Sequence, residues 1–299
     1  MKKRMTMILF LAMALLLAGC SGGTDADAKV IKVGHKNYTE QRILGEIFGQ
    51  LIEANTDYTT EVIEFGGTSI VFEALKAREV DVYAEYTGTA YGAILAQSEL
   101  KDPQAVYDYV AKEYKEQFDV EWLPELGFNN TYTFSVRREV AEQYNIKTVS
   151  EMIEVADELR FAATVEFLAR EDGLPGVKKY YKDFKFKEEM GIDPGLRYET
   201  IKSGKTDVID AFSTDGKILE YDLVVMKDDK QFFPPYYAAP IMNGESYLAY
   251  PEVVAELEKL NRIMDDAAML QLNYNVDVEK TPIEEVAHTF LVNAGLISE

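Results

Sequence analysis

The sequence has a single cysteine, Cys20, so a disulfide within the chain is excluded. Its two histidines, His35 and His288, have no cysteine partners and form no HExxH pattern. Those residue types supply most zinc sites, so no site of that kind is predicted. A metal site made of carboxylates alone stays open, although no group of them has the spacing of metal ligands. We predict no metal and no cofactor.

Signatures of catalysis are also missing. Gly66-Gly67 lacks the lysine that follows in phosphate-binding loops. Ser213-Thr214-Asp215 has no histidine placed to activate its serine, and we expect Asp215 to cap a helix that starts near Gly216. The sequence therefore predicts that the protein is not an enzyme.

Basic residues are scarce, since 31 Lys and Arg stand against 52 Asp and Glu and give a net charge of −21. Nucleic-acid binding demands a basic surface, so that class of partner is excluded. The acidity is typical of a well-solvated protein, which we expect to be a monomer.

The only long apolar run extends from Met5 to Ala18, after the basic residues 2–4. It is typical of a secretory signal and is too short to span a bilayer comfortably. It ends in Leu17-Ala18-Gly19-Cys20, which resembles the lipobox of bacterial lipoproteins, where the cysteine is lipidated. We expect a lipoprotein signal peptide over 1–19, a flexible tether over 20–29 and an extracytoplasmic protein that is lipid-anchored to the cell membrane. An ordinary secreted protein with a stray thiol is the alternative.

The remaining residues exceed one typical domain, so two lobes are expected. Strands predicted at 30–34, 61–65 and 81–86 alternate with helices predicted at 39–54 and 69–78, and this order indicates a parallel α/β sheet. Apolar residues at helical spacing mark the first of these helices. Near the end of the chain, a helical stretch over 253–272 and a last helix that starts at Thr281 are expected to pack onto the first lobe.

A weak internal repeat relates the two halves. Residues 72–76, 81–82 and 86–87 recur at an offset of 126 as residues 198–202, 207–208 and 212–213. Each copy reads as a helix, a turn and a strand that ends in an aromatic and a hydroxyl residue. If the repeat is real, each lobe directs one ring and one hydroxyl toward a shared cleft, beyond the carboxyl ends of its strands. Chance similarity between amphipathic helices is the alternative.

Tyrosine is abundant, with 19 residues against one tryptophan, and several aromatic residues follow predicted strands. Most tyrosines of any protein are half-buried core or surface residues, but rings in loops around a cleft can do more. A quaternary ammonium has no N–H to donate, so it is held by π-faces and by close packing of its methyl groups. A box of three or four rings supplies that environment.

Five stretches spread over most of residues 30–296 are distinctive. They are GHKNYTEQ (34–41), DVYAEYTGT (81–89), REDGLPG (170–176), DAFSTDG (210–216) and FFPPY (232–236). In their sequence and in their order along the chain, they resemble stretches of the glycine betaine/carnitine/choline-binding lipoproteins of osmoprotectant ABC importers. The resemblance implies a two-lobed, periplasmic-binding-protein-like α/β fold of type II, with parallel or mixed sheets flanked by helices and linked by a hinge. We expect lobe 1 over 30–130 and 237–299 and lobe 2 over 131–236.

The resemblance also implies the site. Its aromatic box maps to Tyr86, Tyr132, Phe212 and Tyr236. The family usually has tyrosine where this chain has Phe212, which keeps the π-face and loses a hydroxyl. In some members a carboxylate clamp is present, and it maps to Lys36, Thr89 and Arg170. Two cations and a hydroxyl suit a carboxylate, so the clamp favours betaines or carnitine over choline.

The expected function is therefore that of a solute-binding lipoprotein, which captures a quaternary-ammonium osmolyte between two lobes and then docks on an ABC permease. Three alternatives stay open on a similar scaffold: a binding protein for an amino acid or another small cation, an extracytoplasmic enzyme, and a ligand sensor that feeds a signalling partner.

Overall fold

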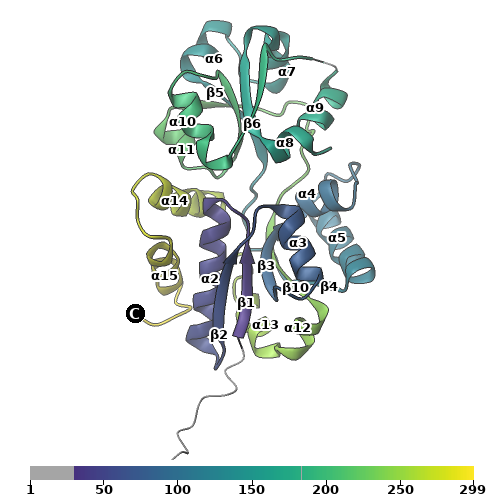
Figure 1. Cartoon of the computed structure of the whole chain (residues 1–299), viewed down its shortest axis with the longest axis vertical. Helices are drawn as coiled ribbons and strands as arrows, with labels where there is room; N and C mark the ends of the chain where they lie inside the picture. The colour runs from purple at the N-terminus through teal and green to yellow at the C-terminus, as the bar shows by residue number, and fades with distance from the viewer. Residues whose placement is uncertain (1–29, 183) are drawn as a thin grey trace, which may run out of the picture.

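The computed structural model describes residues 30–182 and 184–299, which form two lobes stacked along the long axis of the molecule (Figure 1). The expected signal peptide, the lipidation at Cys20 and the tether over 20–29 lie outside the described residues. The predicted two-lobed α/β fold, with mixed sheets flanked by helices, is confirmed.

Lobe 1, as we use the term here, is built on a sheet with the strand order β2-β1-β3-β10-β4. Its strands are β1 (Val30–His35), β2 (Thr59–Glu64), β3 (Val82–Tyr86), β4 (Val120–Trp122) and β10 (Ala238–Asn243). Strand β1 pairs in parallel with β2 and β3, whereas β10 runs antiparallel to β3 and β4. All five residues of β3 are buried, because helices cover both faces of this central strand.

The helices of lobe 1 are α2 (Thr39–Asn55), α3 (Thr68–Lys76), α4 (Thr87–Thr89), the π-helical turn 90–94, α5 (Pro103–Phe118), α12 (Gly244–Ala249), α13 (Pro251–Glu258), α14 (Asp266–Asp277) and α15 (Ile283–Asn293). Helix α2 forms because its apolar residues recur at helical spacing, and that stripe is fully buried. Helix α5 starts where the side chain of Asp102 accepts a hydrogen bond from the backbone N–H of Ala105.

Lobe 2 is built on a sheet with the strand order β7-β6-β8-β5-β9. Its strands are β5 (Tyr132–Arg137), β6 (Arg160–Thr164), β7 (Glu188–Ile192), β8 (Val208–Phe212) and β9 (Leu223–Met226). Its helices are α6 (Arg138–Tyr144), α7 (Val149–Glu154), α8 (Val165–Ala169), α9 (Leu174–Tyr181), α10 (Arg197–Lys202) and α11 (Lys217–Glu220), with 3₁₀ turns at 156–158 and 194–196.

The internal repeat corresponds to equivalent parts of the two sheets. At the predicted offset of 126, β3 and β8 are the central strands, and each follows a helix, α3 or α10. The strands therefore end in equivalent rings, Tyr86 and Phe212. The hydroxyls that follow do not face the cleft as expected: Thr87 accepts from the N–H of Tyr237, and Ser213 accepts from the N–H of Thr131.

The chain crosses between the lobes twice, once between β4 and β5 and once between β9 and β10. The crossings lie side by side, because Asn129 and Tyr237 form an antiparallel bridge and the N–H of Asn130 donates to the carbonyl of Tyr236 at 3.0 Å. These paired segments form the hinge. The lobe limits predicted at Asn130 and Tyr236 stay a prediction.

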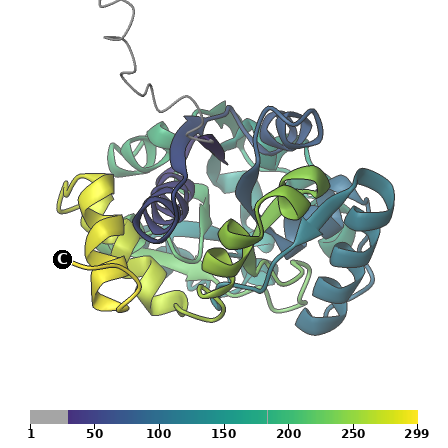
Figure 2. The same ribbon diagram turned by 90° about the horizontal axis from the view of Figure 1, so that it is seen from below.

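The helix predicted over 253–272 is wrong in one respect, since it is broken into α13 and α14. Between them, the N–H groups of Arg262 and Met264 donate to the carbonyls of Glu125 and Leu126. This pairing with a distant segment competes with the helix. Helices α13, α14 and α15 pack against α2, as expected (Figures 1 and 2). The last helix begins at Ile283, two residues after Thr281.

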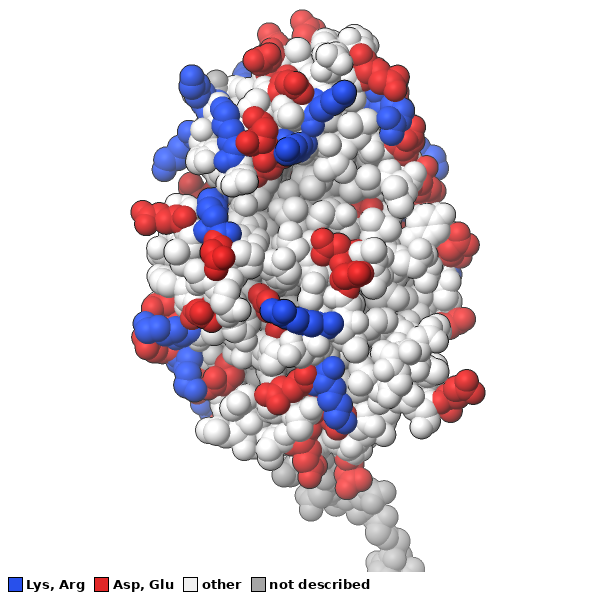
Figure 3. All heavy atoms as spheres, turned by 180° about the vertical axis from the view of Figure 1, so that it is seen from behind, with Lys and Arg blue, Asp and Glu red and all other residues white. Residues whose placement is uncertain are grey.

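Acidic and basic side chains are interspersed on the face seen in Figure 3. Within residues 30–182 and 184–299, no helix is long and apolar enough to cross a membrane. Within these same described residues, no three or more His, Cys, Asp or Glu side chains lie together in a way that could hold a metal ion.

Candidate ligand-binding site

A small cavity lies between the lobes, where β3 and β8 end. Its lining contains Lys36, Tyr38, Thr68, Tyr86, Thr89, Asn130, Tyr132, Glu166, Arg170, Phe212 and Tyr236. All seven side chains predicted for the aromatic box and the clamp are thus brought together, from both lobes and the hinge. Their roles toward a ligand stay predictions.

The cavity has a volume of about 20 Å³, little more than one water-sized probe needs. Its walls must therefore move apart to admit a small organic molecule. Four larger hollows of about 720, 520, 510 and 410 Å³ lie elsewhere on the described surface. The hollows of 520 and 510 Å³ also span both lobes and contain lysines, but their rings all come from lobe 2. We assign the site to the small cavity because rings of both lobes meet there.

The predicted rings pack against one another. The ring centroid of Tyr132 lies 5.0 Å from that of Phe212 and 5.8 Å from that of Tyr236, which stands nearly perpendicular to it. Tyr86, Tyr132 and Tyr236 are each at most 5% exposed. Strand ends place three of the rings, since Tyr86 closes β3, Phe212 closes β8 and Tyr132 opens β5. Tyr236 comes from the hinge.

A fifth ring, Tyr38, was not predicted. It stacks on Phe212 with the centroids 5.4 Å apart and an interplanar angle of 27°. Tyr38 follows β1 and precedes α2, so it too extends beyond the carboxyl end of a strand. Tyr86 and Phe212 share this kind of position, so it was a signal that could have identified Tyr38.

The predicted clamp lysine is already paired inside lobe 1. The Nζ of Lys36 donates to Oε1 of Glu85 at 2.6 Å, and both side chains are almost fully buried. The same nitrogen lies 5.1 Å from the centroid of the Tyr86 ring. Glu85 also accepts from the hydroxyl of Tyr83 at 2.8 Å. Lys36 therefore stabilises a buried carboxylate and one face of Tyr86.

The predicted clamp arginine is paired as well. Arg170 donates to both oxygens of Asp172, from Nε at 2.7 Å and from Nη2 at 2.5 Å. Nη2 also lies 3.4 Å from the hydroxyl of Thr89, and the hydroxyl of Tyr236 donates to Asp172 at 3.0 Å. Since a guanidinium has five N–H donors, Nη1 keeps donors for a ligand carboxylate.

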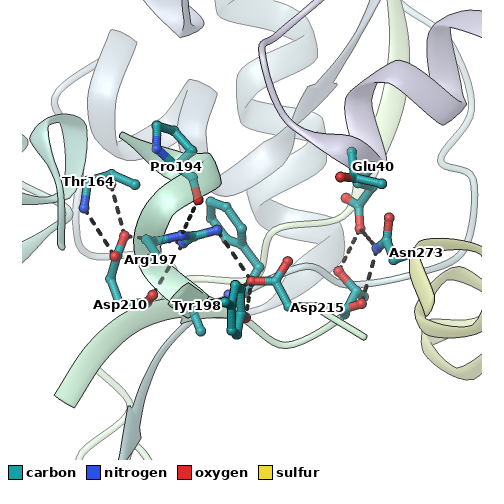
Figure 4. Close-up of polar contacts among 12 residues, drawn as sticks. Glu40, Thr164, Pro194, Arg197, Tyr198, Asp210, Asp215 and Asn273 are labelled. Carbon is teal, nitrogen blue, oxygen red and sulfur yellow. Dashed lines mark hydrogen bonds and ion pairs between the residues drawn. The ribbon is translucent and has the colours of Figure 1, made fainter. Parts of the chain in front are cut away.

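A buried arginine of lobe 2, Arg197, packs against the Phe212 ring. Figure 4 shows Arg197 between Asp210 and Asp215. The guanidinium carbon of Arg197 lies 5.0 Å from the Phe212 centroid, and its nitrogens contact Asp210 at 3.5 Å and Asp215 at 3.4 Å. The hydroxyl of Tyr198 donates to Asp215 at 2.6 Å. The prediction that Asp215 caps a helix is wrong: α11 starts after Gly216 without a side-chain cap, because the Asp215 carboxylate is used by these partners.

One carboxylate, Glu40, lies buried in the first turn of α2, beside the cavity. It accepts from the hydroxyls of Tyr86 and Thr214 and from the side-chain amides of Asn130 and Asn273. Burial raises the pKa of Glu40 above its ordinary value, while these hydrogen bonds act in the opposite direction. Glu40 lies in a segment that sequence reasoning singled out, but it was given no role.

At the outer edge of the cavity, Glu166 of lobe 2 reaches the start of α3 in lobe 1. Its Oε1 accepts from the N–H of Thr68 at 3.2 Å. The preceding residue, Gly67, is the N-cap and has no side chain to do this. A carboxylate at a helix N-terminus is favourable, so Glu166 caps α3 from the opposite lobe. No sequence pattern could have indicated a cap supplied from so far along the chain.

The charges around the cavity do not balance. The cations Lys36 and Arg170 are outnumbered by carboxylates, which are Glu40, Glu85, Glu166 and Asp172. Such a site attracts a cation and offers a ligand carboxylate only the remaining donors of the clamp. The arrangement suits a molecule whose positive end is held by rings.

Comparison with known proteins identifies relatives of the chain. Residues 29–293 match the family model of the substrate binding domain of ABC-type glycine betaine transport systems. Over 291 residues, the chain is 35% identical to the carnitine transport binding protein OpuCC of Listeria monocytogenes, and the alignment covers 95% of this chain and 94% of that protein. The chain also superimposes on the solved structure of a glycine betaine/carnitine/choline ABC transporter with a TM-score of 0.72 and 31% identity. This match covers 89% of our chain and 99% of the chain in that structure.

A further relative is the ergothioneine transport permease/ergothioneine binding protein EgtU of Helicobacter pylori (strain G27). It is 37% identical to this chain over 274 residues, which cover 90% of this chain and 48% of the relative. The chain thus spans about half the length of that protein.

Proposed function

The chain belongs to the family of substrate-binding domains of ABC-type glycine betaine transport systems, and on this premise we propose that it captures a quaternary-ammonium osmolyte for an ABC permease. The solutes that fit are glycine betaine, proline betaine, carnitine and choline. The protein binds its solute without converting it, as a monomer, and it uses no metal or cofactor.

One observation carries the proposal: rings from both lobes and the hinge line a single cavity, and further carboxylates lie directly behind its wall. A methylated ammonium cannot donate a hydrogen bond, so it gains most from π-faces, at about 2 kcal/mol per ring when desolvated. A primary amine would instead need acceptors directed into the cavity. Tyr38, Tyr86, Tyr132, Phe212 and Tyr236 supply the π-faces.

The clamp decides between betaines and choline. In our proposal, the remaining donors of Arg170 and the hydroxyl of Thr89 hold the ligand carboxylate, and Lys36 adds its positive charge from beneath Tyr86. Choline has a hydroxyl in place of the carboxylate and gains less from these groups. A betaine is therefore the preferred ligand.

Transport follows from the two lobes. Solute enters between the separated lobes, rotation about the hinge encloses it, and the closed form presents the permease with a surface that the open form lacks. We place the protein outside the cytoplasm and anchored through a lipid on Cys20. Family membership supports the extracytoplasmic site, and the Leu-Ala-Gly-Cys sequence supports the anchor.

Isothermal titration calorimetry tests the ligand class. Glycine betaine, proline betaine, carnitine, choline and a set of amino acids are titrated separately into the protein. We expect a quaternary ammonium to bind and primary amines to give no heat. Binding of a primary amine alone would reject the proposal.

Arg170→Ala tests the clamp in the same experiment. We expect glycine betaine to lose about tenfold or more in affinity, because a charged hydrogen bond contributes about 1.5 kcal/mol or more, and choline to lose far less. Equal losses for the two ligands would reject the clamp assignment.

Ergothioneine is a second candidate, and Glu166 is the observation that favours it. Ergothioneine is also a betaine, but its ring carries N–H groups that glycine betaine lacks. Among the described residues, Oε2 of Glu166 has only a 3.9 Å contact with Arg170, so it can accept a hydrogen bond from such a ring. Glu166→Gln should then weaken ergothioneine binding and leave glycine betaine binding nearly unchanged. Glu142→Gln, at another exposed position of lobe 2, is the matched control.

A further inference from the structure

Glu40 contacts the Tyr86 hydroxyl at the end of β3 and Thr214 in the loop after β8, although it is not part of the cavity lining. The residue Glu40 is 3% exposed, so hydrogen-bond donors must stabilise the charge of its carboxylate in place of water. Oε1 accepts from the Tyr86 hydroxyl and the Asn130 amide, each at 2.6 Å. Oε2 accepts from the Thr214 hydroxyl at 2.5 Å and the Asn273 amide at 3.2 Å.

These donors come from different bodies. Tyr86 and Asn273 belong to β3 and α14 of lobe 1, Asn130 belongs to the hinge, and Thr214 belongs to the loop after β8 of lobe 2. The amide of Asn273 also donates to the backbone carbonyl of Thr214 at 3.1 Å, and Figure 4 shows Asn273 facing Glu40. Among the four donors to Glu40, only Thr214 belongs to lobe 2, so lobe opening removes this donor and breaks the bond between Asn273 and Thr214 with it.

The loop that carries Thr214 also carries a ring of the box. Phe212 lies two residues earlier, and its N–H donates to the Asp215 carboxylate at 3.0 Å, which holds residues 212–215 in a fixed turn. Through Thr214, Glu40 thus fixes the Phe212 loop, and through its other oxygen it fixes the Tyr86 hydroxyl. One carboxylate joins the two equivalent rings of opposite lobes.

Both oxygens of Glu40 are occupied by these four donors, so it has no free acceptor for a ligand. Its effect on binding must pass through other residues. An open molecule would leave a buried carboxylate with one charged hydrogen bond fewer, and closure restores that bond.

We propose that Glu40 is a positioning residue that couples closure of the lobes to assembly of the aromatic box, with Thr214 as its contact in lobe 2. The inference rests on the proposed function for its ligand, but the coupling between Glu40 and closure is a property of the protein alone.

Thr214→Val is the main test, because valine keeps the shape and removes only the hydroxyl. Thr206→Val is the matched control: Thr206 is also in lobe 2 and 1% exposed, and its hydroxyl has no partner among the described residues. Thr214→Ser keeps the hydroxyl and should restore wild-type behaviour. Glu40→Gln is a further variant, which places an amide where only donors face it.

Closure is measured by single-molecule energy transfer between two dyes, one on each lobe. The dyes are attached to cysteines introduced at two exposed positions, by Leu248→Cys in lobe 1 and Leu196→Cys in lobe 2. Cys20→Ser removes the native cysteine so that only these two positions are labelled. We expect Thr214→Val to lower the closed fraction and to raise the Kd of glycine betaine and of choline by the same factor, about tenfold. Thr206→Val and Thr214→Ser should match the parent protein, and the urea midpoints of all three should agree closely.

Two results would overturn the proposal. One is an equal closed fraction in Thr214→Val and Thr206→Val, with or without ligand. The other is a change in Kd for only one of the two ligands, which would indicate direct contact with the ligand. If no quaternary ammonium binds at all, the proposed function fails, while the closed fractions measured without ligand still decide the role of Glu40.

Discussion

The two lobes share one strand order but fix their equivalent rings by different means. In both sheets three parallel strands form one side, and two further strands with antiparallel pairing complete the other side, β10 and β4 in lobe 1 and β5 and β9 in lobe 2. Tyr86 of lobe 1 is held through its hydroxyl, which donates to Glu40. Phe212 of lobe 2 has no hydroxyl and is held by stacking and by its backbone. The same position can thus serve a tyrosine or a phenylalanine, provided that the neighbours differ.

A buried ion pair lies beside each of these rings. In lobe 1, Lys36 lies 5.1 Å from the Tyr86 centroid and pairs with Glu85 of the same strand as the ring. In lobe 2, Arg197 lies 5.0 Å from the Phe212 centroid and pairs with Asp210, again on the strand of the ring, and with Asp215. The lobes therefore repeat an electrostatic arrangement as well as a topology, although the cations come from different positions in the repeat.

Removal of these cations should give the largest effect. Lys36→Met and Arg197→Met each leave buried carboxylates without their counter-charge, which costs about 3–5 kcal/mol of unfolding free energy. We expect the greater loss for Arg197→Met, because two carboxylates lose their partner. Urea unfolding followed by circular dichroism measures both. The electrostatic parallel between the lobes breaks if either variant is as stable as the parent protein.

Removal of the rings should give the next effect. Tyr86→Ala and Phe212→Ala each remove a π-face, at a cost of about 2 kcal/mol, or about thirtyfold in Kd. Tyr86→Ala should lose more, since Glu40 also loses a donor. Tyr86→Phe separates the two contributions. Calorimetric titration with the preferred ligand measures them, and a greater loss in Phe212→Ala would contradict the distinction drawn between the lobes.

A third comparison concerns the aspartates that precede the central strands, again at the offset of 126. Asp207 is bound by Arg160 and Arg137, whereas Asp81 accepts from the N–H of Lys32 and the hydroxyl of Ser246. Burial alone would raise the pKa of Asp207, but the hydrogen bonds and charges of the arginines outweigh it and lower the pKa to about 2.

Because the folded-state pKa of Asp207 is depressed, its ionised form stabilises the fold above about pH 4, and this contribution disappears as the pH falls toward 2. Asp207→Asn should therefore cost about 2 kcal/mol at pH 7 and progressively less toward pH 2. Asp81→Asn should cost about 1 kcal/mol or less, because its partners are uncharged groups. Unfolding curves between pH 2 and 7 check this, and a pH-independent deficit in Asp207→Asn would contradict it.

The elements and rings whose signals are local could be predicted from the sequence. Apolar spacing marked α2, and an aromatic residue at a strand end marked Tyr86 in lobe 1 and Phe212 in lobe 2. Sequence reasoning missed the pairing of Lys36 with Glu85 and of Arg170 with Asp172, since both cations were expected to be free for a ligand. Which carboxylate a buried cation meets depends on the packing of β1 against β3 and on the loop after α8, and neither is visible in the spacing of residues.

Contacts between distant segments explain the other errors. The break between α13 and α14 arises because the backbone N–H of Arg262 donates to the backbone carbonyl of Glu125, far away in sequence. Asp215 has the position of a helix cap but is recruited by Arg197 and Tyr198. Tyr38 was missed although, like Tyr86 and Phe212, it lies at the carboxyl end of a strand. Local patterns thus located the site, but its internal partners had to come from the structure.

The paired hinge segments have a consequence for the order of events in capture. Tyr132 and Tyr236 lie within a few residues of the Asn129–Tyr237 bridge, so a rotation about the hinge displaces them least. If the proposed function holds, we expect a cation to meet Tyr132 and Tyr236 first, at their perpendicular contact of 5.8 Å, while the lobes are still apart. Tyr86 and Phe212, which lie on strands of opposite lobes, should then reach the ligand last, as the lobes close.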